Sequence, residues 1–94
     1  MYTLEFDEDA WKEWNKLDST LRDQFKKKLK KVLVMPHIQA NKLSSLQGCY
    51  KIKLRASGYR LVYQVKDDVV IVEVIAIGKR ERNEVYKTAA KRLD

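Results

Sequence analysis

The chain has 94 residues, of which 45% are hydrophobic and 35% charged, and it carries a net charge of +7. It is too apolar for a disordered chain and no apolar run could span a membrane, so we expect one domain over residues 1–94. Cys49 is the only cysteine, which excludes an internal disulfide and fits a reducing cytoplasm.

The amino-terminal residues predict a short strand followed by a helix. Tyr2–Phe6 alternates apolar and polar side chains, as a strand does. Asp7–Asp9 then suits a helix amino terminus, where the helix dipole favours anions. The apolar stripe of this helix comprises Ala10, Trp11, Trp14 and Leu17.

A second helix follows after little more than a cap, which Asp18 or Ser19 can supply. Its apolar positions recur at spacings of about four and are Leu21, Phe25, Leu29, Val32 and Leu33. The short connection predicts an antiparallel pair of helices packed on a sheet. The lysines between residues 26 and 31 indicate a solvated face, with contact to a phosphate backbone as the alternative.

Three strands are expected after Pro36 ends the helix and residues 37–48 form a loop. Tyr50–Ala56 and Tyr59–Lys66 form a hairpin across Ser57 and Gly58, because glycine can adopt positive φ. The β-branched run Val69–Ile77 predicts a buried strand, which Gly78 ends.

A carboxy-terminal helix is predicted over Glu81–Leu93, with Val85 and Ala89 on its buried side. The order of elements is β-α-α-β-β-β-α, which indicates an α+β domain. We expect a mainly antiparallel sheet of about four strands, with the two amino-terminal helices and the carboxy-terminal helix packed on it.

The segment 50–60 gathers cations on one face of a strand. Lys51, Lys53 and Arg55 alternate with apolar residues, so they point to the same side. Like charges at this spacing repel one another, and residues 42–66 contain six bases and no acid. A nucleic acid outside the fold explains this arrangement; a solvated basic surface is the other interpretation.

The residue types exclude several kinds of site. One cysteine and one histidine cannot form a zinc site, no glycine-rich phosphate loop is present, and no Ser or Cys has an evident His base. What remains is a basic and aromatic set: Lys51, Lys53, Arg60, Lys79, Arg80, Arg82 and Tyr86. We therefore expect no metal and no cofactor.

Such a set suits RNA cleavage, because the ribose 2′-OH itself can attack the adjacent phosphate. The protein then has to deprotonate the hydroxyl, stabilise the phosphorane and assist the leaving 5′-oxygen. A second cation at roughly 7 Å, in an effective dielectric of about 20, disfavours a charged lysine by about 2.4 kcal/mol, or close to two pKa units. Lys51 or Lys53 is therefore a plausible general base.

The sequence resembles the RelE toxins of bacterial toxin–antitoxin systems. The likeness is carried by Cys49–Val65 and Gly78–Tyr86, and extends to Phe6–Glu8, Lys12–Trp14 and Ala40–Leu43. It implies a small microbial-ribonuclease-like α+β fold. It also implies a ribosome-dependent endoribonuclease that cuts mRNA in the ribosomal A site and thereby inhibits translation.

The resemblance assigns roles to individual residues. Lys51 and Lys53 match the basic strand, with Lys53 favoured as the base; Arg60 matches the arginine that stabilises the transition state. Arg80 matches the residue that assists the leaving group, and Tyr86 the aromatic that stacks on the substrate. A further set is expected to bind RNA, namely Arg55, Lys79 and Arg82.

The implied partners are a cognate RelB-like antitoxin, mRNA and small-subunit rRNA, with operator DNA bound only through the antitoxin. Ser44 stands where close relatives carry an arginine, so one secondary RNA contact is expected to be weaker.

Two other functions stay open from the residues: a ParE-like toxin that inhibits gyrase, and a non-enzymatic basic module that binds nucleic acid.

Overall fold

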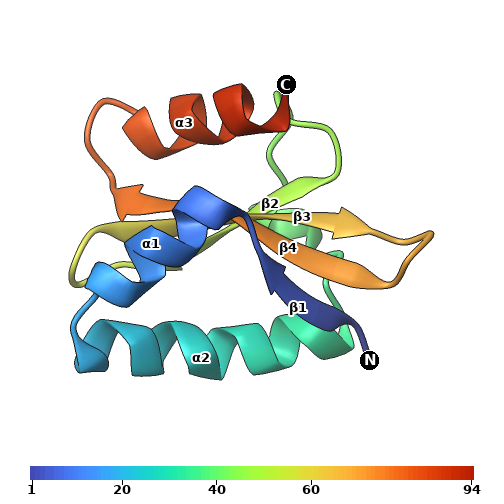
Figure 1. Cartoon of the computed structure of the whole chain (residues 1–94), viewed down its shortest axis with the longest axis horizontal. Helices are drawn as coiled ribbons and strands as arrows, with labels where there is room; N and C mark the ends of the chain where they lie inside the picture. The colour runs from blue at the N-terminus through green and yellow to red at the C-terminus, as the bar shows by residue number, and fades with distance from the viewer.

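The structure, a computed structural model, describes all residues from Met1 to Asp94. Its elements follow the predicted order β-α-α-β-β-β-α (Figure 1). The helices are α1 (Glu8–Lys16), α2 (Ser19–Val34) and α3 (Glu84–Leu93), and Gln39–Asn41 forms a single 3₁₀ turn. The strands are β1 (Thr3–Phe6), β2 (Cys49–Leu54), β3 (Tyr59–Lys66) and β4 (Ile71–Lys79).

Aspartate side chains begin the first two helices. The carboxylate of Asp7 accepts hydrogen bonds from the backbone N–H groups of Asp9 and Ala10, at 2.9 and 3.1 Å. Asp18, one of the two predicted caps, accepts from the N–H of Leu21 at 2.9 Å. Each carboxylate satisfies donors that have no partner in the first turn of a helix, so both helices begin where the sequence indicates.

The third helix begins at Glu84, three residues later than predicted. Arg82 and Asn83 have φ values of 50° and 59°, in the left-handed region, which a right-handed helix cannot include. Asn83 precedes the helix without a side-chain cap. The segment that joins β4 to α3 is therefore a turn rather than a helical extension.

The four strands form one sheet in the order β1-β4-β3-β2. The pairs β2–β3 and β3–β4 are antiparallel, which confirms the mainly antiparallel sheet. The remaining pair, β1–β4, is parallel, so the sheet is mixed. Along the chain, β4 follows α1, α2 and the β2–β3 hairpin. Strand β1 pairs with the other side of β4 and forms one edge of the sheet.

The boundaries predicted for two strands were wrong by two residues at their ends. Val69 and Val70 belong to the turn before β4, where they are 54% and 46% exposed. Gly78 does not end the strand, because β4 continues through it to Lys79 and Gly78 lies opposite Arg60 in the β3 ladder. Likewise β2 ends at Leu54, so Arg55 lies in the hairpin turn.

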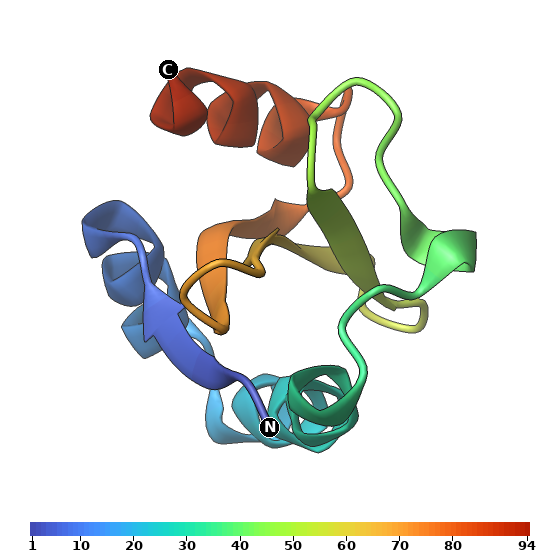
Figure 2. The ribbon, with the colours of Figure 1, turned by 90° about the vertical axis from the view of Figure 1, so that its right-hand side faces the viewer.

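The sheet separates two hydrophobic clusters. Residues of α1 and α2, among them Trp14, Phe25 and Leu29, pack on one face against Ile52 and Tyr63. The opposite face carries a smaller cluster, which consists of Cys49, Val62, Ile75, Ala76, Val85 and Ala89. Figure 2 shows α2 and α3 on opposite sides of the sheet.

Because α3 is short, its cluster covers only part of its face of the sheet. The remainder of that face, towards the β2–β3 turn, holds the polar side chains described below. None of the three helices combines the length and the apolar composition that crossing a bilayer requires.

Val70 gives a testable consequence of the β3–β4 turn. It has φ 56°, a conformation that is unfavourable for a β-branched side chain, and nearly half of its surface is exposed. We expect Val70→Gly to raise the free energy of unfolding by about 0.5–1 kcal/mol, measured by chemical denaturation. The matched variant Val69→Gly, at a neighbour without positive φ, should lower it; equal effects of the two variants would contradict the strain.

Candidate active site

The alternation of β2 places two lysines on the face that α3 shares. Tyr50, Ile52 and Leu54 are buried against the helices of the other face, so Lys51 and Lys53 point the opposite way. Cys49, two residues before Lys51, packs in the α3 cluster, which identifies that face. The predicted alternation of this segment is therefore confirmed for Lys51 and Lys53.

Arg60 lies directly across from Lys53 in the antiparallel β2–β3 pair. It is 5% exposed and is the only buried charged residue of the chain. Its guanidinium donates a hydrogen bond to the backbone oxygen of Tyr59 at 3.1 Å. Arg60 forms no ion pair within the chain, so a buried guanidinium beside a lysine has no carboxylate to neutralise it.

The end of β4 lies beside Lys53 and Arg60, as the contacts of Gly78 and Arg80 show. Gly78 lies opposite Arg60 and adds no side chain above it; a Cβ there would lie 3.7 Å from the Cβ of Val85 on α3. The backbone N–H of Arg80 donates to the oxygen of Gly58 at 2.8 Å. This bond ties the residue after β4 to the β2–β3 turn, near Lys53 and Arg60.

Tyr86 and Lys51 line the same groove between α3 and the loop before β2. The groove has a volume of about 530 Å³ and also includes Ser44, the position at which close relatives are expected to carry arginine. Tyr86 is half-buried against the α3 cluster. An aromatic ring and a lysine at one groove fit a nucleobase and the phosphate beside it.

Three predicted RNA-binding residues lie around this centre in different ways. Arg55, in the hairpin turn, lines two further grooves between β2 and α2 together with Lys53 and Lys28. The Nζ of Lys79 lies 5.8 Å from the ring centroid of Tyr59, on the face of the sheet opposite Arg60. Arg82 is exposed in the turn before α3.

The charges around Lys53 lower its pKa below the ordinary lysine value. The largest cause is the positive charge of Lys51, followed by desolvation and by the charge of Arg60; a hydrogen bond with Lys51 and the charge of Arg55 also contribute. Each cation disfavours a further positive charge. This direction agrees with the effect of crowding predicted from the sequence, and it singles out Lys53.

The predicted site cations share the absence of an acidic partner. The five ion pairs of the structure involve Lys12, His37, Lys66 and Arg92, the last of which pairs twice. None involves the predicted set, which comprises Lys51, Lys53, Arg55, Arg60, Lys79, Arg80 and Arg82. The fold therefore presents these charges unneutralised to whatever binds there.

Two further cations at the groove were not singled out from the sequence. Lys42 and Lys87 line it together with Lys51 and Tyr86. Lys87 directly follows Tyr86 in the sequence, which is a weak signal for it. Lys42 comes close only because its backbone bridges to Tyr50, a contact between a loop and a strand that no sequence pattern indicates.

Neither the cysteine nor a metal ion is suited to act in this site. Burial raises the pKa of Cys49 to about 11, so its thiol stays protonated at neutral pH and is a poor nucleophile. No group of three or more His, Cys, Asp or Glu side chains is positioned to hold a metal ion.

Comparison with known proteins gives the same family throughout. Residues 4–84 match the model of the family described as "ParE toxin of type II toxin-antitoxin system, parDE". The chain is 64% identical over 92 residues to the "mRNA interferase toxin RelE" of Escherichia coli strain K12, covering 98% of this chain and 97% of that protein. The identity to the "mRNA interferase RelE" of Shigella flexneri is also 64%, with the same coverage.

Solved structures agree with the sequence comparison. A free-state double arginine-to-alanine mutant of the E. coli toxin RelE superposes with a TM-score of 0.91 at 61% identity, covering 99% of this chain and 98% of that one. RelE in the intact E. coli RelBE toxin–antitoxin complex gives 0.84 at 63% identity, covering 87% of this chain and all of that one. The chain therefore belongs to the ParE toxin family of type II toxin–antitoxin systems, within which its similarity places it among the RelE toxins.

Proposed function

We propose that this chain is the toxin of a type II toxin–antitoxin system, a single domain over residues 1–94 that cleaves mRNA in the ribosomal A site. The observation that carries this proposal is the pair formed by Lys53 and the buried, unneutralised Arg60, directly opposite each other in the β2–β3 ladder. The mRNA interferase names of relatives at 64% identity support it.

The reaction begins with the ribose 2′-OH of the message. Lys53, whose pKa is lowered by its cationic neighbours, takes the hydroxyl proton. The 2′-oxygen then forms a bond to the adjacent phosphorus, and the bond from phosphorus to the 5′-oxygen breaks. Arg60 donates to the phosphorane oxygens; its burial and its bond to Tyr59 fix the guanidinium before the substrate arrives.

Arg80 and Tyr86 complete the site at its other side. Arg80 stabilises the charge that develops on the leaving 5′-oxygen; because an arginine stays protonated, water supplies the proton that this oxygen takes up. Tyr86 stacks on a base in the groove that Lys51 shares, which holds the 2′-OH in line with the phosphate.

The remaining cations bind RNA on either side of the reacting phosphate. Arg55 extends the positive surface from Lys53 towards α2, and Arg82 extends it towards α3. Lys79 is turned to the other face by its contact with Tyr59, so its expected contribution is to long-range attraction rather than to the scissile phosphate.

The proposed partners follow from the same similarity. Solved structures include RelE in complex with the antitoxin RelB, and we propose a cognate RelB-like antitoxin for this chain. The antitoxin would contact operator DNA on behalf of the complex. Because the target is a translating ribosome with its mRNA and small-subunit rRNA, the toxin acts in the cytoplasm.

Removal of the Arg80 guanidinium should abolish most of the cleavage. We expect Arg80→Ala to lower the single-turnover rate constant on programmed ribosomes by on the order of 10²–10³-fold, because one charge-stabilising donor is lost. The measurement maps new 5′ ends on the message. Arg22→Ala, which removes an arginine from α2 away from the site, should cleave like the parent chain.

The same assay separates the proposed function from the two others. Intact message together with blocked DNA supercoiling would indicate a gyrase inhibitor. Salt-sensitive RNA binding with neither effect would indicate a binding module without activity. Either result with the parent chain would overturn the proposal.

The role of Lys53 as base makes a prediction about pH. The rate should rise with pH as Lys53 loses its proton, and Lys51→Gln should move this rise to higher pH, because the charge of Lys51 is the largest cause that lowers the pKa of Lys53. Single-turnover rates across a pH series measure the shift. An unchanged profile in Lys51→Gln would contradict Lys53 as the base.

A stoichiometric amount of the cognate antitoxin should abolish cleavage, since the antitoxin is expected to close the cationic face. The experiment compares the parent chain with its purified complex on the same programmed ribosomes, and the antitoxin of an unrelated system serves as the control. Cleavage by the complex at the rate of the free toxin would rule out this mode of inhibition.

A further inference from the structure

The inner face of α3 is held to the fold by a charge as well as by apolar contacts. Val85 and Ala89 are 4% and 0% exposed, and the next position on the same stripe is Arg92. Val85 and Ala89 are the only fully buried side chains of α3, Tyr86 and Leu93 are partly buried, and a helix of ten residues is marginal on its own. The contacts of Arg92 therefore add to a limited set of apolar contacts that hold α3.

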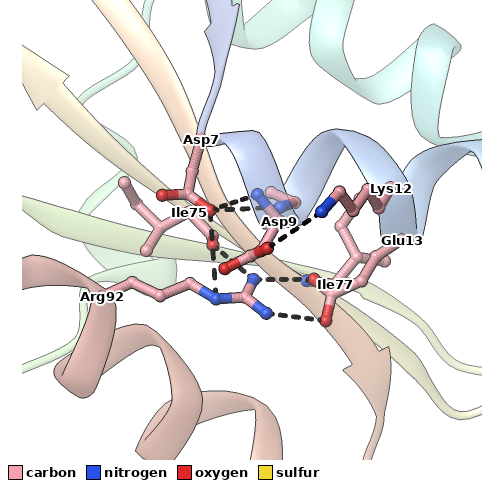
Figure 3. A network of polar contacts seen from close by, with 8 residues as sticks. Asp7, Asp9, Lys12, Glu13, Ile75, Ile77 and Arg92 are labelled. Carbon is pink, nitrogen blue, oxygen red and sulfur yellow. Dashed lines mark hydrogen bonds and ion pairs between the residues drawn. The ribbon is translucent and has the colours of Figure 1, made fainter.

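Arg92 joins α3 to α1 through a bidentate ion pair (Figure 3). Its Nη1 and Nη2 donate to Oε1 and Oε2 of Glu13, at 2.8 and 3.0 Å. Its Nε lies 3.9 Å from a carboxylate oxygen of Asp7, the residue that caps α1. The side chain of Arg92 is 17% exposed, so this pair is largely shielded from water.

The same two side chains also bind the backbone of β4. Nη1 of Arg92 donates to the oxygen of Ile75 at 2.9 Å, and Oε1 of Glu13 accepts from the N–H of Ile77 at 3.1 Å. Strand β1 ends at Phe6, opposite Val74, so these later residues of β4 have no strand beside them on that side. Glu13 and Arg92 take the place of the missing strand and bind the three elements α1, β4 and α3 together.

The other end of α3 is held by the apolar contacts of Val85 and has no side-chain ion pair. Asn83 gives the helix no side-chain cap, and the turn before it runs through two residues of positive φ, Arg82 and Asn83. Tyr86 lies near this end, six residues or about 9 Å along the helix axis from Arg92. With the Arg92 end released, α3 can pivot about Val85 and Ala89, and we expect such a pivot to move Tyr86 relative to the groove.

We propose that Glu13 and Arg92 are positioning residues for RNA cleavage, acting through α3 to hold Tyr86 against the groove that contains Lys51. The inference rests on the proposed function. It assigns a role to residues far along the chain from the cationic strands, and neither of them touches the substrate.

The test compares Arg92→Met with Lys91→Met in single-turnover cleavage on programmed ribosomes. Both remove one positive charge from α3, but Lys91 is exposed and forms no ion pair. We expect Arg92→Met to lower the rate constant about tenfold, as misplacement of a substrate-orienting group does. Lys91→Met should leave it unchanged. Glu13→Gln, which cannot form the charged bidentate pair, should resemble Arg92→Met and disturbs the fold less.

A second comparison separates positioning from a general loss of structure. In a Tyr86→Ala background, Arg92→Met should cause no further loss of rate, because the side chain that it positions is already absent. Circular dichroism establishes that each variant is folded at the assay temperature, and amide hydrogen exchange should increase across 84–93 in Arg92→Met and Glu13→Gln.

Three results would overturn the inference. The first is an unchanged cleavage rate in folded Arg92→Met and Glu13→Gln. The second is a loss of rate in Lys91→Met equal to that in Arg92→Met. The third is that Arg92→Met lowers the rate in the Tyr86→Ala background as much as it does in the parent chain. Failure of the proposed function looks different, because the parent chain itself would then leave the message intact on the ribosome.

Discussion

Burial of Tyr50, Ile52 and Leu54 under α2 turns the alternate residues Lys51 and Lys53 out of the core, on the side of the sheet that α3 shares. The ladder then carries this constraint across the sheet, because Lys53 lies opposite Arg60 and Arg60 opposite Gly78. The core on one face therefore fixes the positions of the charges on the other. A slip of one residue in β2 would bury both lysines and empty the site in the same step.

The cations of this site destabilise the folded protein and also change the properties of Lys53. Cations without acidic partners repel one another, and the free protein holds them together only because the strands are packed. The same repulsion lowers the pKa of Lys53. Phosphates of the bound RNA reduce this repulsion and therefore raise the pKa of Lys53 again. Lys53 is thus most readily neutral, and able to accept the proton of the 2′-OH, before the phosphates are fully bound.

Local pattern was sufficient to predict much of the molecule. Alternation gave the faces of β2, aspartates gave the helix starts, and the resemblance to RelE toxins led to the correct family. The errors occurred where a tertiary contact decides the outcome. Gly78 stays within β4 because it pairs with Arg60, and Arg55 lies in the hairpin turn, out of the alternation of Lys51 and Lys53, because β2 ends at Leu54. The contact between Glu13 and Arg92 spans 79 residues of sequence, and no periodicity reports such a pair.

The order of the strands also determines at what point during synthesis the sheet can be completed. The first strand to be made, β1, pairs only with β4, which lies between it and β3. The sheet cannot close until Lys79 has been added, and the bond from α3 to α1 needs Arg92, close to the last residue described. Early segments of a nascent chain usually fold first, but here β1 must wait for the later strand β4. A protein whose proposed target is a translating ribosome thus acquires its active surface only after its own ribosome has added Arg92.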